Sequence, residues 1–208
     1  MGPVPRRVAV PELADPDALA RLPRGRMLGL TGAPGAGKST LAARLAALTG
    51  AAVVAMDGFH LADVELRRRG LLGRKGAPET FDAEGYAALL ARVRLREPLV
   101  MAPAFERDLE QPLAGAVPVP GSADQVVTEG SYLLLDEPRW AAVRARLDTV
   151  WHVHLDRDLR RDRLLARHVT FGKTPAEARA WVESVDDPNA ELVESAAHRA
   201  DLVLDLTP

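Results

Sequence analysis

The chain has 208 residues, 47% of them hydrophobic, so it can bury one substantial core, as a single domain or as a core with a small lid. A formal net charge of −2 gives no reason to expect a nucleic-acid partner, and the absence of cysteine excludes disulfides, thiolate catalysis and zinc–cysteine sites. Apolar runs all fall short of the ~18–20 residues of a membrane span, and Met1 is followed by no signal-peptide pattern. We therefore expect a cytoplasmic protein.

Apolar runs alternate with helical patterns along the chain, which predicts a mainly parallel α/β sheet. Residues 1–25 are rich in Pro and Arg, with a short helix near 15–22 and no recognisable chemistry. The predicted core strands cover residues 26–31, 51–56, 125–128, 149–155 and 202–206. The predicted helices follow residue 40 and cover 62–69, 82–94, 138–147, the arginine-dense stretch after 158, and segments opening at 174 and 187. Prolines in 99–105 and 116–119 predict an edge hairpin.

One segment matches the phosphate-binding pattern G-x-x-x-x-G-K-[ST] between an apolar strand and a helix. It reads Gly32, Ala33, Pro34, Gly35, Ala36, Gly37, Lys38, Ser39, Thr40. Glycines let backbone N–H groups converge on phosphate oxygens, and the helix N-terminus adds partial positive charge. Lys38 can reach the β- and γ-phosphates, the Ser39 hydroxyl can ligate Mg²⁺, and Thr40 is placed near the α-phosphate. The alternative is a glycine-rich turn without a ligand.

Acidic side chains follow two further strands. Asp57 comes after strand 51–56, and Glu129 ends strand 125–128. Because ligands bind at the carboxyl ends of parallel strands, we expect Asp57 to face the crevice of residues 32–40. We also expect the strand before Asp57 to neighbour the strand before Gly32.

Basic and aromatic residues allow competing interpretations. Arg74 and Lys75 lie beside Gly76 and Pro78, which favours a loop over an anionic ligand, whereas residues 67–69 are typical of a solvated helix face. Positions 160, 163 and 167 share one helical face, which is either solvated or directed at a ligand.

Several histidine and tryptophan residues are expected to pack within the fold and to have no role in binding. His152 and His154 alternate on a predicted strand, and we expect ordinary strand residues rather than metal ligands, since no carboxylate cluster has matching spacing. Trp151 and Trp181 are predicted in the core. His60 is assigned either to an acceptor pocket or to packing.

Five segments together resemble the P-loop kinases that include uridine kinase, pantothenate kinase and phosphoribulokinase. They are residues 32–40, 56–60, 74–82, 127–135 and 163–172, and they look closest to bacterial nucleoside/nucleotide kinase family proteins, also labelled fructose transport system kinases. The resemblance implies a three-layer α/β/α sandwich with a mainly parallel central sheet and a small helical lid. It implies a single kinase domain over residues 1–208, with a lid near 157–175 and a substrate-side insert near 61–122.

The resemblance also implies roles for individual residues. Asp57 matches the carboxylate that activates the acceptor hydroxyl, and Glu129 stands where an acid holds Mg²⁺ together with Ser39. Arg163 and Arg167 match lid arginines that neutralise charge on the transferred phosphate, with position 160 third. The alternatives are a capping or surface aspartate, a structural strand-end acid and a solvated arginine face.

Further matched positions concern the nucleotide base and the acceptor. Asn189 stands where the C-terminal segment passes the adenine ring, and Arg74 and Lys75 match a substrate-side loop. The flap residues Phe105 and Arg107 depart from both the uridine and the pantothenate kinase patterns, so neither recognition transfers. With Glu106 and Asp108 between and beside them, and with His60 near, a polar pocket for a sugar or another polyhydroxylated acceptor is favoured.

These features predict a kinase that uses ATP and Mg²⁺ and phosphorylates a hydroxyl of a sugar- or nucleoside-like small molecule. Neither nucleic acid nor membrane is expected as a partner, and a homodimer is left open. The alternatives are a pantothenate-type kinase, a regulatory P-loop NTPase without acceptor chemistry, and a degenerate kinase fold kept as an interaction protein.

Overall fold

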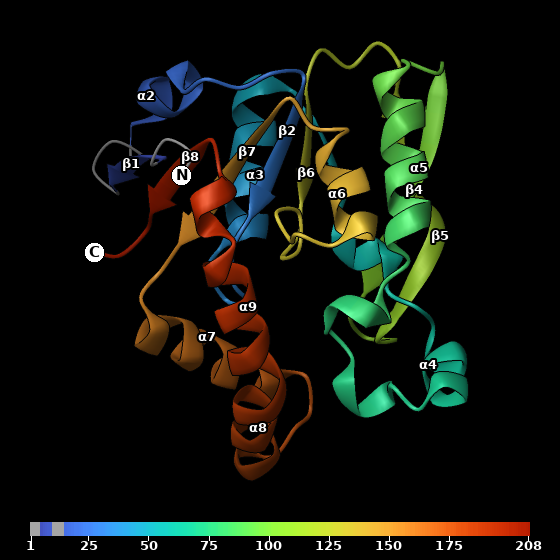
Figure 1. The fold of residues 1–208 in the computed structure, drawn as a ribbon, viewed down its shortest axis with the longest axis vertical. Helices are drawn as coiled ribbons and strands as arrows, with labels where there is room; N and C mark the ends of the chain where they lie inside the picture. Colours follow the sequence, from blue (N-terminus) through green and yellow to red (C-terminus); the bar gives the residue numbers. More distant parts are fainter. Residues whose placement is uncertain (1–4, 10–14) are drawn as a thin grey trace.

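The computed structural model describes residues 5–9 and 15–208. Within them, six parallel strands form the central sheet in the order β1-β8-β7-β2-β6-β3 (Figure 1). The strands are β1 (Arg6–Ala9), β2 (Met27–Thr31), β3 (Ala52–Ala55), β6 (Val126–Glu129), β7 (Thr149–His154) and β8 (Leu202–Asp205). The predicted parallel α/β sheet is thereby confirmed, although β1 was not predicted, because in a short arginine-rich edge strand only Val8 is buried.

Helices cover both faces of this sheet. On one face, α2 (Pro16–Arg21) and α3 (Lys38–Thr49) pack their leucines against Leu28 and Leu30 of β2. On the other, α5 (Ala83–Arg94), α6 (Pro138–Arg144) and α9 (Asp187–Ser195) share a hydrophobic core with Met27. Neighbouring residues of β2 thus serve opposite cores, which explains why the whole strand is buried and reads as a continuous apolar run.

The remaining elements extend from this three-layer body. A separate antiparallel pair joins β4 (Leu99–Glu106) to β5 (Gln111–Pro120), as the predicted edge hairpin requires. The helices α4 (Asp63–Arg69), α7 (Arg157–Thr170) and α8 (Pro175–Trp181) lie toward one end of the molecule in Figure 1, α7 and α8 on one side and α4 on the other. Short 3₁₀ turns cover Met56–Phe59, Leu72–Arg74, Pro78–Thr80 and Ala197–Arg199.

Two expectations about connectivity are wrong. The strand β6 lies between β2 and β3, so the strands that precede Gly32 and Asp57 are not neighbours. Strand order is set by crossover connections, and these can leave room for a strand from later in the chain. The last helix does not begin as a separate segment at residue 187 either. The chain stays helical from α8 through a π-helical turn, Val182–Asp186, into α9, and the Asp187 carboxylate instead accepts hydrogen bonds from Arg157 (3.1 Å) and Arg161 (2.6 Å).

No helix among residues 5–9 and 15–208 combines the length and hydropathy needed to cross a bilayer.

The core packing predicts a large effect of truncating α5. Leu90 is fully buried beneath the sheet, so Leu90→Ala should lower the free energy of unfolding by about 2–5 kcal/mol. Leu95, at the end of the same helix, is 78% exposed, and Leu95→Ala should change it by less than about 0.5 kcal/mol. Urea unfolding of both variants measures the difference, and similar losses in the two would contradict this account of the core.

Candidate active site

The glycine-rich segment forms a tight loop between β2 and α3. Gly37 caps α3 with φ of 99°, and Gly35 has φ of 79°, which are left-handed conformations that favour glycine. At Gly32, a Cβ atom would lie 2.4 Å from the carbonyl oxygen of Val153, so a side chain would collide with β7. Ala33 and Ala36 are fully buried and support the loop from below. The loop therefore presents backbone and short side chains to the space above it.

Lys38 lies within the curve of this loop. Its Nζ donates to the carbonyl oxygens of Gly32 (2.8 Å) and Ala33 (3.2 Å) and to Ser131 Oγ (3.2 Å). Burial lowers the pKa of Lys38, although the carboxylates of Glu129 and Asp57 oppose that shift. The cation is thus held in place by the chain itself, at the start of a helix.

Two carboxylates face this lysine from the ends of strands. Glu129 is buried at the end of β6 and accepts a hydrogen bond from Ser39 Oγ at 2.9 Å. Its pKa is raised, first because burial penalises the charged form and then because the Asp57 carboxylate lies nearby. Asp57 follows β3 in the Met56–Phe59 turn. Two acids and the Ser39 hydroxyl thus offer hard oxygen atoms beside the loop, which are the ligands that Mg²⁺ prefers.

A cavity of about 670 Å³ joins these groups. It is lined on the loop side by Pro34, Gly35, Gly37, Lys38, Ser39 and Thr40, and on the strand ends by Asp57, Glu129 and Ser131. The carboxyl ends of β2, β3 and β6 therefore open into one space, as expected for a parallel sheet. Asp57 and Lys38 share this space, which is the juxtaposition that the sequence predicts.

One wall of the cavity near Asp57 is aromatic. His60 Nδ1 lies 2.8 Å from the Asp57 carbonyl oxygen, and its ring packs between Phe81 (4.0 Å between centroids) and Phe105 (4.8 Å). Burial lowers the pKa of His60, so the neutral ring is favoured. From the hairpin, Arg107 reaches the Asp57 carboxylate at 3.3 Å.

The side chains of Lys75 and Arg74 line different cavities in the structure. Lys75 lines the cavity wall, paired with Asp63 at 2.8 Å and 5.3 Å from the centre of the Phe105 ring. Arg74 instead pairs with Glu79 at 2.7 Å and lines a separate cavity of about 350 Å³. Arg74 therefore lies outside the cavity of Lys38 and Asp57, because the 3₁₀ turn at Leu72–Arg74 directs its side chain away from that of Lys75.

The arginines of α7 also divide. Arg163 and Arg167 line the cavity, and Arg163 Nη1 would lie 3.7 Å from a Cβ atom at Gly37 of the loop. Burial lowers the pKa of Arg167, and Arg107 adds to that effect. Arg160, one turn earlier on the same face, is buried, and its Nε donates to the Leu155 carbonyl oxygen at 3.2 Å. Arg160 therefore anchors the start of α7 and does not line the cavity.

The far end of the cavity is formed where α8 continues into α9. Asn189 is buried there and lines the cavity. His168 and Asp186 are paired beside it at 2.7 Å. Trp181 lines the same region with Lys173 Nζ 4.8 Å from its ring centre, so the prediction that Trp181 lies in the core is wrong. Trp181 is half-buried, at the point where α8 continues into the π-helical turn beside the cavity.

Sequence reasoning missed Ser131, His168 and Asp186 as cavity residues. Ser131 could have been found, because it follows Glu129 by two residues at the same strand end. His168 and Asp186 lie 18 residues apart, and their pairing depends on the π-helical turn, which no sequence pattern indicates.

A glycine loop between a buried strand and a helix, a lysine inside it and an acid–serine pair beside it define the class of P-loop nucleotide-binding proteins. Comparisons with known proteins narrow the class. The chain is 36% identical over 146 residues to "ATP-dependent kinase-like protein notR'" of Aspergillus versicolor, covering 65% of this chain and 85% of that protein. It is 30% identical over 192 residues to "Putative uridine kinase C227.14" of Schizosaccharomyces pombe, covering 86% and 82%.

A solved structure is also similar. The crystal structure of a "putative fructose transport system kinase" from Silicibacter sp. TM1040 shares 39% identity with a TM-score of 0.78, and the match covers 88% of this chain and 91% of that one. No family model matches the chain. The relatives show that the chain belongs to the uridine kinase-like P-loop kinases. The predicted family, the α/β fold class and the kinase class of enzyme are therefore confirmed.

The raised pKa of Glu129 predicts a pH-dependent gain in stability from Glu129→Gln. A carboxyl group whose pKa is higher in the folded chain favours folding at low pH, and that contribution is lost as the pH rises through the folded pKa. The variant should therefore unfold at higher urea concentration than the unaltered protein at pH 8, with the difference shrinking toward pH 5.

The exposed Glu191, on α9, supplies the control, and Glu191→Gln should follow the unaltered protein at both pH values. A loss of stability in Glu129→Gln at pH 8 would contradict the account.

Proposed function

We propose that the chain transfers the γ-phosphate of Mg²⁺·ATP to a hydroxyl group of a sugar- or nucleoside-like small molecule. The observation that carries the proposal is that Lys38 and Asp57 line the same cavity. A phosphate-holding lysine and a carboxylate that lines the space for a second molecule are the two groups that in-line transfer needs.

The loop end of the cavity suits a triphosphate. Backbone N–H groups of the loop and the start of α3 would hold the β- and γ-phosphates together with Lys38. Ser39 Oγ and Glu129 Oε1, 2.9 Å apart, fit the hydroxyl and carboxylate ligands of Mg²⁺. When bound, the ion would neutralise charge on the phosphate oxygens.

Asp57 suits the acceptor end. In the proposed step the acceptor oxygen bonds to the γ-phosphorus while the bond from that phosphorus to the β–γ bridging oxygen breaks, and ADP leaves with the electron pair. The Asp57 carboxylate accepts the proton of the acceptor hydroxyl, or holds that hydroxyl in line. Arg107, 3.3 Å from Asp57, would contact the polar groups of the same acceptor.

We assign the whole chain to one kinase domain in which residues 157–175 act as a lid and residues 61–122 form a substrate-side insert. Arg163 and Arg167 of the lid line the cavity and would neutralise charge on the transferred phosphate. The insert contributes Lys75, Phe105 and Arg107 to the acceptor wall. At the far end, the buried Asn189 would contact the nucleotide base.

The acceptor wall favours a compact polar molecule with a face that can pack on rings. His60 and Phe105 offer aromatic faces, and the cationic Lys75 and Arg107 border them. A sugar ring presents an apolar face and several hydroxyls, which matches this mixture better than an extended flexible chain.

Asp57→Asn should keep ATP binding within about twofold and lower acceptor-dependent ADP release by about 10²–10⁴-fold, the range typical of a lost general base. ADP release measured against a panel of sugars, nucleosides and pantothenate, with ATP binding by calorimetry, tests this. Asp124→Asn, in the exposed loop before β6 and outside the cavity lining, is the matched control and should retain activity. Acceptor-independent hydrolysis that Asp57→Asn leaves unchanged would instead favour a regulatory NTPase.

Lys38→Ala should weaken ATP binding by at least tenfold, because its Nζ is the cation inside the phosphate loop. Calorimetric titration with ATP and Mg²⁺ measures the loss, and Asp57→Asn serves as the comparison variant that keeps its affinity. Unchanged ATP affinity in Lys38→Ala would contradict the assignment of the loop.

A further inference from the structure

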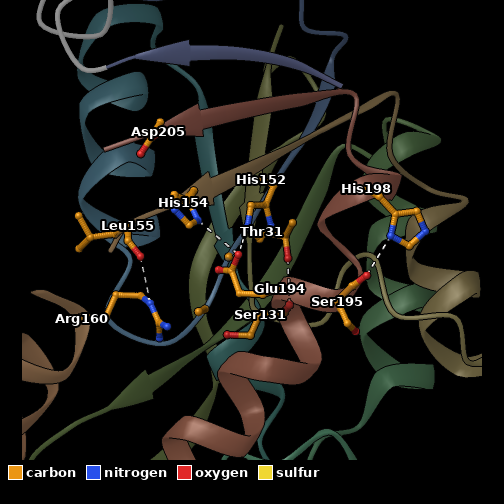
Figure 2. A network of polar contacts seen from close by, with 12 residues as sticks. Thr31, Ser131, His152, His154, Leu155, Arg160, Glu194, Ser195, His198 and Asp205 are labelled. Carbon is orange, nitrogen blue, oxygen red and sulfur yellow. Dashed lines mark hydrogen bonds and ion pairs between the residues drawn. The ribbon is translucent and has the colours of Figure 1, made fainter. Parts of the chain in front are cut away.

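Three side chains outside the cavity converge on one point of the sheet. His152 and His154 lie two residues apart on β7 and so face the same side, where Glu194 reaches them from α9 (Figure 2). The Glu194 Oε2 atom lies 3.2 Å from His152 Nε2 and 3.3 Å from His154 Nδ1. The expectation that no carboxylate accompanies these histidines is wrong, because the partner comes from a helix 40 residues further along the chain.

Hydrogen bonds satisfy only some of the polar atoms of this cluster. Both rings contact the same carboxylate oxygen, whereas the other one, Glu194 Oε1, is buried without a hydrogen-bond partner in the described chain. The His152 side chain is only 1% exposed, and its buried Nδ1 has no hydrogen-bond partner among residues 5–9 and 15–208. Buried polar atoms left unpaired destabilise the folded chain, so hydrogen bonding alone does not explain why these residues are gathered here.

The spacing suits a cation in tetrahedral coordination. Zinc–nitrogen and zinc–oxygen bonds of about 2.0–2.1 Å place neighbouring ligand atoms about 3.3 Å apart. The two contacts to Glu194 Oε2 have this length, and the three ligand atoms all lie within 4.8 Å of one another. Imidazole nitrogens select first-row transition metals over Mg²⁺ and Ca²⁺, which prefer oxygen ligands.

We propose that His152, His154 and Glu194 bind a divalent transition-metal ion of the Zn²⁺ type, with water in the fourth position. The side chains of His154 and Glu194 are 31% and 30% exposed, which leaves a path for the ion and room for water. A dication would take the place of the ring protons that now face the carboxylate, and would compensate its buried charge.

The proposed site is distinct from the Mg²⁺ ligands Ser39 and Glu129, but it lies behind the phosphate loop. His152 pairs in register with Thr31, the last residue of β2 before the loop. Thr31 Oγ1 donates to the Ser131 carbonyl oxygen at 2.9 Å, and Ser131 Oγ contacts Lys38. Glu194 belongs to the helix that also carries Asn189. A bound ion would therefore fasten α9 to the sheet, which is a structural role independent of phosphate transfer.

Co²⁺ is a suitable probe, because its visible absorption is strong in tetrahedral sites and weak in octahedral ones. The full chain would be titrated with Co²⁺ in excess Mg²⁺ and a non-hydrolysable ATP analogue, which occupy the proposed phosphate site. We expect one Co²⁺ per chain with a tetrahedral spectrum, displaced by Zn²⁺. Glu194→Gln and His154→Asn should each weaken binding at least tenfold, with folding verified by circular dichroism.

The matched control is His198→Asn. His198 is exposed near the cluster, and its Nδ1 contacts the Ser195 carbonyl oxygen at 2.9 Å (Figure 2). This variant should bind Co²⁺ within twofold of the unaltered protein. Absence of tetrahedral Co²⁺, its loss on addition of Mg²⁺, or equal binding by the folded Glu194→Gln and His154→Asn variants would overturn the proposal. None of these outcomes depends on kinase activity.

Discussion

The parallel arrangement of the strands is the constraint on which the site depends. Because β2, β6 and β3 run in the same direction, the phosphate loop, Glu129 and Asp57 all emerge at one edge of the sheet. Burial of β2 against both helical layers fixes that edge, since each residue of the strand is packed on one side or the other. The positions of the functional groups at this edge are therefore set by the apolar packing of the strands beneath them.

The ionisable groups at this edge lie in surroundings that disfavour their charged forms. Burial disfavours the charged forms of both Lys38 and Glu129, and the two acids oppose each other. Neighbouring groups of opposite sign offset only part of that cost. A site assembled in this way gains from the arrival of phosphates and a divalent ion, because each ligand supplies the charge that its half of the site lacks.

The sequence predicted those features that are encoded locally. Strand, loop and helix around Lys38 could be recognised because the glycines, the lysine and the apolar flanks are contiguous. The placement of Asp57 followed from the general behaviour of parallel strand ends. The features that could not be predicted are contacts between segments distant in the sequence. They are the insertion of β6 between β2 and β3, the His168–Asp186 pair, and the approach of Glu194 to β7. The different positions of the Arg74 and Lys75 side chains depend on one short 3₁₀ turn, and hydrophobic periodicity does not predict a turn of that length.

The unbroken helical run from Pro175 to Ser195 has a mechanical consequence (Figure 1). Asp187, within this run, accepts hydrogen bonds from Arg157 and Arg161 of α7, so α7 contacts the helical run near its middle. A displacement of α7 would therefore act on the helical run in both directions, toward Trp181 and toward Glu194. The π-helical turn Val182–Asp186, with its i→i+5 hydrogen bonds, separates Trp181 from Asp187 and Glu194, so the two α-helical stretches differ in hydrogen-bond register.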